Sequence, residues 1–481
     1  MDWLPIILFL LIGLGTMAAC DSVSPRVPLP GLAALAFWTG AMTATLLLIA
    51  VAVATGRFYF WLVWVLAAAC VVVLVWRRGI LIERFRTIHI ATDQNSLLMS
   101  ASCLPPIGFS AWNIYHSAKY HFQFEIISFD AIGNFAMKAK LWFHTHQLIP
   151  EQLKNPDFIM FKRRYPPIVP LSEALWAYLG GGWDGVALKW FFLACWISVG
   201  LLIFALVRLR ANALSGWLAA AVWFAIPINI EFVWIGALTG YADVPLALGF
   251  LAVSLMLGEC REDRRWGAVV LLGLLLGAAF WTKKEGIPFA LAALAYMAVN
   301  RRPWRHWAAL AAMCLLFAGF HWLSVRGLPA YFEKDVSFNL PGFEIRYRLS
   351  QLNRLLHNEF GKEDRWGERL WGILILVWGF KLLKLEWNWR TLFPRELFFF
   401  LFMGAVYSMV CVFTIFHFQR NFEYLFERLM LQIYPLLLVA TFSGFSPLSK
   451  GSAPVQAAGQ PITPPTGPLV ALSAAQQESK P

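Results

Sequence analysis

Long apolar stretches recur along almost the whole chain, and short groups of charged residues separate them. A helix needs roughly 17–25 apolar residues to cross a bilayer. The pattern therefore predicts an all-α polytopic membrane protein with about thirteen transmembrane helices. The expected spans begin near Trp3, Leu32, Phe58, Ser96, Ala187, Ala213, Ala242, Trp266, Gly286, Trp304, Leu370, Glu396 and Leu429.

Basic groups in the short connections indicate the orientation of these spans. They all fall on one side of the membrane in the thirteen-span arrangement, and short loops rich in Arg and Lys stay in the cytoplasm. The N-terminus is then expected outside and the C-terminal tail inside. The groups are RRGILIERFR (77–86), VRLRAN (207–212), CREDRRW (260–266), NRRPWRHW (300–307) and KLLKLEWNWRTLFPRE (381–396).

Two long segments, at about 116–185 and 324–369, interrupt the spans on the outer face, and both are expected to carry amphipathic helices. In the first, AIGNFAMKAKLWFHT predicts a helix along the membrane surface. Its apolar stripe consists of Ile132, Phe135, Ala136, Ala139 and Phe143.

The chain divides into three expected regions. Residues 1–95 contain N-terminal transmembrane helices and a cytoplasmic loop, and residues 96–446 contain the main transmembrane region. Residues 447–481 are rich in Pro, Ala, Gln and Ser. Such a composition cannot bury a core, so this part is expected to be a disordered cytoplasmic tail.

Composition agrees with a membrane protein. Hydrophobic residues make up 59% of the 481 residues and charged residues 14%, whereas soluble domains carry about 25% charged residues. The net charge of +12 comes from scattered Arg and Lys, so a nucleic-acid-binding protein with a basic patch is not indicated. The seven cysteines form no CxxC pair or Cys/His cluster, and neither a zinc site nor a disulfide framework is expected.

Ionisable residues that could do chemistry gather near the outer ends of the expected spans. Asp130 lies in the first long outer segment, and FKRRYPPIVPL follows it with Arg164 and Tyr165. GYADVPLA places Tyr241 and Asp243 at the outer end of a span. TKKEG places Lys283, Lys284 and Glu285 between two short apolar halves, and ERLMLQIYP places Arg428 before the last span.

The motifs FDAIGNFAMKAK, RYPPIVPL, GYADVPLA, TKKEG and ERLMLQIYP occur in this order over about residues 96–446. With the long outer segment after an early helix, this order resembles the GT-C superfamily of integral-membrane glycosyltransferases, and most closely its protein-O-mannosyltransferase and lipid A aminoarabinose transferase branch. The chain departs from the family pattern in two ways. Three extra spans precede the helix that leads into the segment, where many members have one, and the acidic pair is here the single Asp130, with Glu125 five residues before it.

The resemblance implies an inverting transfer of a sugar from a polyprenyl-phosphate donor to an acceptor hydroxyl on the external face of a bacterial inner membrane. Asp130 would be the general base, and Arg428 with Lys283 or Lys284 would stabilise the leaving phosphate. Further substrate-binding residues would be Arg164 and Tyr165 at the donor site, Asp243 in a supporting role on the acceptor or metal side, and Tyr241 and Glu285. The acceptor would be a lipid, glycan or protein.

Each of these residues also has a structural interpretation. Asp130 and Asp243 could cap helices, the two lysines could extend to the interface, and Arg428 could anchor a helix end. A divalent metal is possible and no other cofactor is indicated. Two other functions stay open, a transporter or flippase of lipid-linked sugars and a polymerase or ligase of surface polysaccharide. A transporter would need charges lining a path through several spans.

Overall fold

The computed structural model describes residues 3–22, 24, 26–79, 81–82, 96–126, 128, 131–155, 163–230, 236–262, 266–300, 303–328, 344–350, 368–383, 394–413 and 418–443. Met1–Phe445 form one compact unit and Ser446–Pro481 a second. The expected tail at 447–481 lies outside the described residues. The described residues form helices and no strand, apart from one isolated bridge between Arg57 and Gln147. The prediction of an all-α chain is confirmed.

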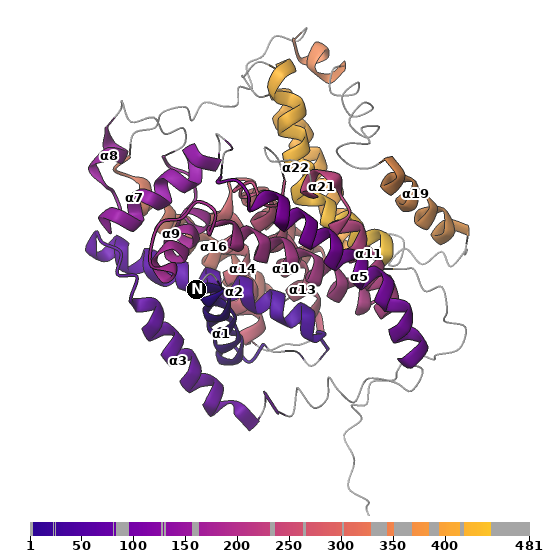
Figure 1. The fold of residues 1–481 in the computed structure, drawn as a ribbon, viewed down its shortest axis with the longest axis horizontal. Coiled ribbons are helices and arrows are strands. Elements are labelled where there is room, and N and C mark those ends of the chain that lie inside the picture. Colours follow the sequence, from indigo (N-terminus) through magenta and orange to yellow (C-terminus); the bar gives the residue numbers. More distant parts are fainter. Residues whose placement is uncertain are drawn as a thin grey trace, which may run out of the picture. The chain divides into compact units, whose positions relative to one another are not determined.

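The helices follow the apolar stretches, and each expected span begins within a helix or no more than four residues before one. They are α1 (Leu4–Ala19), α2 (Leu29–Thr55), α3 (Leu62–Trp76), α5 (Ser96–His121), the π-helix η1 (Ile132–Ala136), α7 (Met137–Thr145), α8 (Glu151–Lys154), α9 (Ile168–Gly180), α10 (Lys189–Arg208), α11 (Ala213–Phe224), α12 (Pro227–Ile230), α13 (Asp243–Glu262), α14 (Trp266–Thr282), α15 (Gly286–Val299), α16 (Trp304–Val325), α19 (Glu368–Leu383), α21 (Arg395–Phe413) and α22 (Phe418–Phe442) (Figure 1).

Four of these helices are long and apolar enough to cross a membrane: Leu29–Thr55, Lys189–Arg208, Asp243–Cys260 and Trp304–Val325. The count of about thirteen spans stays a prediction. α22 begins at Phe418, earlier than the expected Leu429, because a polar stretch such as FQRNFEYLFER can continue a helix that an apolar pattern marks only in part.

α13 is the best-buried of the four long apolar helices. Of its span Asp243–Cys260, 89% is buried, whereas the figure for Trp304–Val325 is 22%. It packs against α10, α14 and α22, and α10 in turn packs against α2 and α11. A charged group at the start of α13 is therefore surrounded by protein on several sides, where it needs a partner of opposite charge.

The N-terminal helices are held to each other by close backbone contact. A Cβ on Gly13 of α1 would meet the carbonyl oxygen of Ala36 at 1.7 Å, and one on Gly40 of α2 would meet that of Phe9 at 1.8 Å. Small residues allow membrane helices to approach in this way. Because α2 also packs on α10, α1 and α2 are part of the same helical body as α13.

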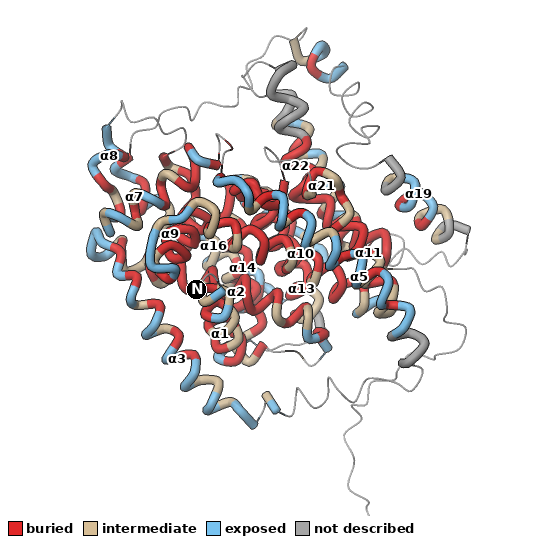
Figure 2. Tube along the Cα trace, viewed as in Figure 1, coloured by how far each residue is buried: buried red, intermediate tan, exposed pale blue. Residues whose placement is uncertain are grey.

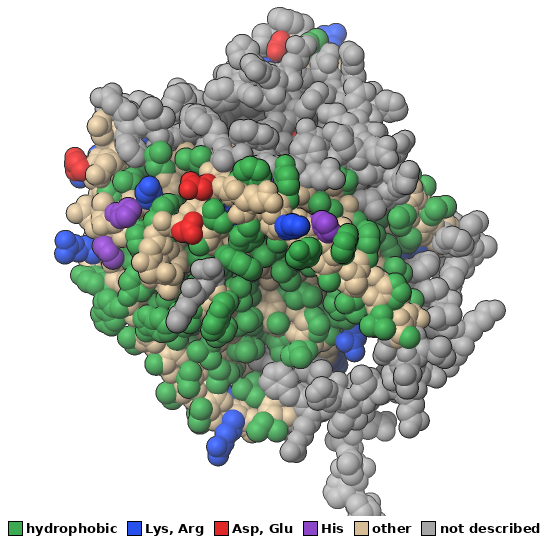
Figure 3. Space-filling model, in the orientation of Figure 1, with side chains coloured by type: hydrophobic (Ala, Val, Ile, Leu, Met, Phe, Trp, Pro, Cys, Tyr) green, Lys and Arg blue, Asp and Glu red, His purple; other side chains and the backbone are tan. Residues whose placement is uncertain are grey.

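Large apolar side chains also face outward. On α3, Trp64, Val72 and Trp76 are exposed, and Figure 2 shows long exposed stretches on this helix. Figure 3 shows hydrophobic side chains over much of the described surface on the face it displays. Apolar surface of this extent is costly in water and suits a protein surrounded by lipid.

The first long outer segment forms packed helices in its described part. Phe135 and Ala139 are buried as the expected stripe requires, but Ile132 is 36% exposed and Lys138 is buried instead. The π-helical turn η1 changes the side-chain register that an α-helical period predicts. α7 packs against α9. Of the second segment, residues 324–328, 344–350 and the start of α19 are described.

Candidate functional site

α13 is preceded by a tight turn that requires glycine. Gly240 has a φ of +90°, which residues with a Cβ rarely adopt. A Cβ at this position would also meet Ile126 Cγ2 at 2.9 Å and Ala131 Cβ at 3.1 Å. The turn therefore brings the segment around residues 126–131 against the start of α13, where Tyr241 and Asp243 are buried.

The carboxylate of Asp243 is bound by three side chains from distant parts of the chain. Lys283 Nζ lies 2.8 Å from Oδ1, and Arg428 Nε lies 2.9 Å from Oδ2. Gln432 Nε2 donates to Oδ1 at 2.6 Å. The Asp243 side chain is 1% exposed. A buried carboxylate with two cations and an amide donor has the compensation that burial demands.

Lys283 extends this network to a second carboxylate. Its Nζ also lies 2.8 Å from Glu285 Oε1, so Glu285, Lys283, Asp243 and Arg428 form a chain of alternating charge. The TKKEG break makes this possible, because α14 ends at Thr282 and α15 starts at Gly286. A Cβ on Gly286 would meet the carbonyl oxygen of Ala279 at 2.1 Å, so the tight connection requires glycine.

Tyr241 lies between this network and the 126–131 segment. The guanidinium carbon of Arg428 lies 3.8 Å from the centre of the Tyr241 ring, a cation–π geometry. The Tyr241 hydroxyl is hydrogen-bonded to the Ser128 hydroxyl. Gln432 is held in turn by the Tyr407 hydroxyl, which donates to its Oε1 at 2.5 Å. Five parts of the chain thus converge here: the 126–131 segment, α13, the α14–α15 connection, α21 and α22.

Asp130 itself lies outside the described residues. Its described neighbours are close to the network, because Ser128 is bonded to Tyr241 and Ala131 lies against Gly240. The segment that carries Asp130 is therefore anchored at the start of α13. Its role as a general base stays a prediction.

Arg164 and Tyr165 make their contacts elsewhere. Arg164 donates to the carbonyl of Leu328 from Nε at 3.0 Å and from Nη2 at 2.7 Å. Tyr165 packs edge-to-face on Phe135, with ring centres 5.0 Å apart. Both side chains fix the start of α9 to its neighbours, and their expected part in donor binding stays a prediction.

Lys138 is a buried cation that the motif analysis does not single out. Its Nζ donates to the carbonyls of Arg163 at 3.1 Å and Tyr165 at 2.9 Å, and it lies 4.8 Å from the centre of the Trp142 ring. Burial lowers the pKa of Lys138 to about 7. Lys138 therefore ties α7 to the RYPP turn, with no acidic partner in the described part of the chain.

Lys284 differs from the lysine beside it. Its side chain is exposed, and no hydrogen bond or ion pair holds it within the described part of the chain. Lys284 and Lys138 both interact electrostatically with His321 of α16. Lys284 therefore adds positive charge beside the network while keeping its donors available.

Sequence reasoning missed Gln432, Tyr407 and Ser128. Gln432 follows Arg428 by four residues in ERLMLQIYP, and residues four apart share a helix face, so this spacing could have revealed it. Tyr407 and Ser128 offer no such signal, because only the packing of α21 against α22 and the turn at Gly240 bring them to the site.

A metal ion does not fit this network well. Two cations neutralise Asp243, and the other carboxylate, Glu285, already binds Lys283. A hard divalent cation needs several free oxygen ligands. Among the described residues, no group of three or more His, Cys, Asp or Glu side chains is placed to hold a metal.

Comparison with known families gives one match. A family model described as dolichyl-phosphate-mannose-protein mannosyltransferase matches residues 164–324, a third of the chain. The matched part contains RYPPIVPL, GYADVPLA and TKKEG and leaves out Asp130 and Arg428. No curated protein and no solved structure matches the chain. The match supports the resemblance to membrane glycosyltransferases of the GT-C type, and over residues 164–324 the chain is similar to that family.

Proposed function

We propose that the protein transfers a sugar from a polyprenyl-phosphate donor to an acceptor hydroxyl, with inversion at the anomeric carbon. The observation that carries this proposal is the contact between the Asp130-bearing segment and the start of α13. Ser128 is bonded to Tyr241, and Tyr241 lies under Arg428. A carboxylate and fixed cations are the two groups that such a transfer needs on opposite sides of the reacting carbon.

In the proposed reaction the acceptor oxygen attacks the anomeric carbon while the bond from that carbon to the phosphate oxygen breaks. Asp130 accepts the acceptor's hydroxyl proton, and the electron pair of the broken bond leaves with the lipid phosphate. Negative charge on this oxygen grows in the transition state, so cations placed beforehand stabilise that state more than the bound donor. No oxidant or further reactant is required.

The structure supports different roles for the three basic residues. Arg428 and Lys283 are each held by Asp243, and Lys283 is 2% exposed. Lys284 is exposed. In this proposal Lys284 and the guanidinium of Arg428 contact the phosphate. Lys283 and Asp243 position Arg428, so that Asp243 is a positioning residue and not the base.

We further propose that the site faces the outside of a bacterial inner membrane. The basic group VRLRAN and the end of KLLKLEWNWRTLFPRE meet in space, because Arg210 and Arg395 both bind Glu396. This is the arrangement that a shared cytoplasmic side requires. The donor's polyprenyl tail then lies among membrane lipids and its phosphate at the outer interface. The acceptor is a lipid, glycan or protein, and no nucleic acid takes part.

Release of polyprenyl phosphate tests the proposal. Purified protein in proteoliposomes is given polyprenyl-phosphate sugars, with membrane extract as the acceptor source, and wild type is compared with Asp130→Asn. We expect turnover by wild type and a loss of about 10²–10⁴-fold in the variant, with donor binding retained. Glu151→Gln is the matched control, because this exposed carboxylate of the same segment binds Lys154 and no other side chain among the described residues.

Two outcomes contradict the proposal. Full turnover by Asp130→Asn would show that Asp130 is not the general base and would leave it the role of a helix cap. If no donor is turned over by wild type but a lipid-linked sugar moves across the liposome membrane, the protein is a transporter and not a transferase.

A further inference from the structure

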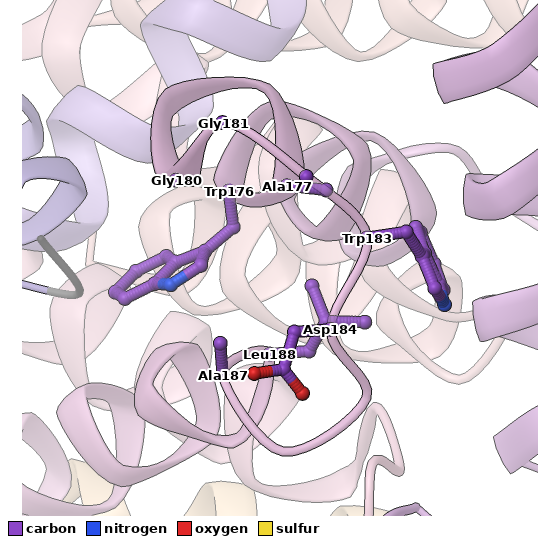
Figure 4. A pocket seen from close by; sticks show the side chains of 9 residues that line it. Trp176, Ala177, Gly180, Gly181, Trp183, Asp184, Ala187 and Leu188 are labelled. Carbon is purple, nitrogen blue, oxygen red and sulfur yellow. The ribbon is translucent and has the colours of Figure 1, made fainter.

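A pocket lies at the other end of α9, in the connection to α10. It has a volume of about 220 Å³ and an opening to the surface. Its wall is formed by the last turn of α9, the glycine-rich turn after it and the start of α10. The lining residues with polar groups or large rings are Trp176, Trp183 and Asp184 (Figure 4).

The pocket offers an available acceptor beside a buried indole. Trp176 is 1% exposed, and in Figure 4 its ring extends away from Trp183 and Asp184, so it forms part of the pocket floor. Asp184 is exposed; its Oδ1 accepts from the backbone N–H of Val186 at 2.8 Å, which fixes the carboxylate and leaves Oδ2 for a ligand.

Trp183 supplies an apolar surface on the rim. Its side chain is half-buried, with its ring centre 6.3 Å from that of Phe143 on α7. In Figure 4 the Asp184 carboxylate lies between the indoles of Trp183 and Trp176. The face of an indole carries partial negative charge and attracts the polarised C–H groups of a sugar ring. A flat ring and a carboxylate acceptor side by side suit a pyranose with several hydroxyls.

The pocket is connected to the candidate site through the segment that leads to Asp130. A Cβ on Gly185, the residue after Asp184, would lie 3.5 Å from the side chain of Glu125. Lys189 of α10 donates to the carbonyl of His121 at 2.7 Å. The same segment then reaches Gly240 through Ile126 and Ala131. A molecule in the pocket therefore lies beside the chain that positions the proposed base.

We infer that this pocket binds a neutral pyranose ring of the acceptor, away from the hydroxyl that reacts. The inference rests on the proposed function and narrows the acceptor to a glycan or glycolipid with more than one sugar unit. The ring stacks on Trp183, and one hydroxyl donates to the Asp184 carboxylate beside it. An acidic sugar is disfavoured, because Asp184 and the neighbouring Glu125 repel it.

Direct sugar binding tests this inference without any turnover. The probes are methyl glycosides of glucose, galactose, mannose, N-acetylglucosamine and glucuronic acid. The full chain is titrated with each probe in a detergent that has no sugar headgroup, and binding is followed by tryptophan fluorescence and saturation-transfer NMR. We expect at least one neutral glycoside to bind with millimolar affinity and to bind more tightly than the glucuronide.

Three variants locate the binding. Trp183→Ala and Asp184→Asn are each expected to weaken it at least tenfold. Trp217→Ala is the matched control, because this half-buried indole packs on Phe204 of α10 and lies outside the pocket; it is expected to bind as wild type does.

The inference is overturned if no neutral glycoside saturates the wild type, if the glucuronide binds more tightly, or if Trp183→Ala binds equally well. Its failure can be told apart from failure of the proposed function. Sugar binding by Asp130→Asn at wild-type affinity supports the pocket whatever the transfer assay shows. If the donor is turned over but no sugar binds, the inference about the pocket is wrong and the proposed transferase function stands.

Discussion

α13 carries one buried carboxylate at its start, Asp243, and contacts a second, Glu396, about three turns along. The surroundings of these two carboxylates differ. Glu396 of α21 is held by the guanidinium of Arg210 at 2.5 and 2.7 Å, by Arg395 at 2.8 Å and by the Ser254 hydroxyl at 2.5 Å. Ser254 follows Asp243 by eleven residues, roughly 16 Å along the helix axis. The second cluster therefore lies well along α13 from the first.

The two clusters use their cations differently. Arg210 binds Glu396 through both terminal nitrogens, a fork that fixes geometry. At Asp243, Lys283 and Arg428 each make one bond to the carboxylate, and Lys283 is shared with Glu285. Beside Asp243 also lie an exposed lysine and the segment that leads to Asp130. The comparison fits a structural role for the Glu396 cluster, and it fits the proposal that the Asp243 cluster holds cations in place for a ligand.

The largest expected effect is at the Glu396 cluster. Glu396→Gln removes the only carboxylate between Arg210 and Arg395 in the described part of that cluster, and breaking a buried ion pair costs about 3–5 kcal/mol. We expect the free energy of unfolding to fall by that amount, measured by denaturant unfolding in detergent. Unfolding indistinguishable from wild type would contradict the structural assignment.

Each cluster contains an arginine, Arg428 or Arg395, and replacing each of them by lysine gives a matched pair of variants. Arg428→Lys keeps the charge but loses the planar fork, and we expect kcat for polyprenyl phosphate release to fall by about 10²–10³-fold. Arg395→Lys, the control beside Glu396, is expected to leave kcat within about twofold while it lowers the unfolding midpoint. Equal losses of kcat in the two variants would show that the clusters have the same role.

The turn before α13 permits a smaller test. Gly240→Ala places a Cβ against Ile126 and Ala131 at a φ of +90°, and this strain costs about 1–2 kcal/mol. Since the turn anchors the segment that leads to Asp130, we expect turnover to fall more than stability does. Gly319→Ala, in α16, is the control, because a Cβ there meets no other atom within 4 Å. If turnover falls only as far as the loss of stability predicts, the turn does not have this anchoring role.

Lys138 adds a third buried group to the comparison. In the described part of the chain this cation donates its hydrogen bonds to carbonyl groups. Its pKa of about 7 lies below the ordinary 10.5, so between these values the unfolded chain binds one more proton than the folded chain. The free energy of unfolding then rises with pH from about 7 towards 10.5. We expect this slope in thermal unfolding between pH 7 and 9.5, and a shallower one for Lys138→Met. Parallel curves for the two proteins would show that Lys138 does not titrate in this range.

The apolar stretches were sufficient to predict where the helices lie. Each expected span begins within an observed helix or no more than four residues before one, because a run of apolar residues is a local property of the chain. The start of α22 was the largest difference, since a polar first part of a helix leaves no hydropathy signal. The buried face of 131–145 was predicted in part, because a π-helical turn changes the side-chain register.

The candidate residues were found through short motifs, but their partners were not. The sequence singled out Asp243, Lys283 and Arg428 without indicating that one carboxylate holds the other two. It gave Glu396 no role beyond the start of a span, although the side chain is fully buried between two arginines. Both carboxylates stand at the start of an apolar stretch, so local pattern could not distinguish them.

The sequence by itself determined that this is an all-α membrane protein and which motifs carry charge near helix ends, because apolar length and charge position are local properties. Only the tertiary structure decided that Asp243 pairs with Lys283 and Arg428, 40 and 185 residues away, and that Glu396 pairs with Arg210, 186 residues away. The free energy that selects such pairs is the cost of leaving a buried charge without a partner. That cost arises only once the helices have packed around it.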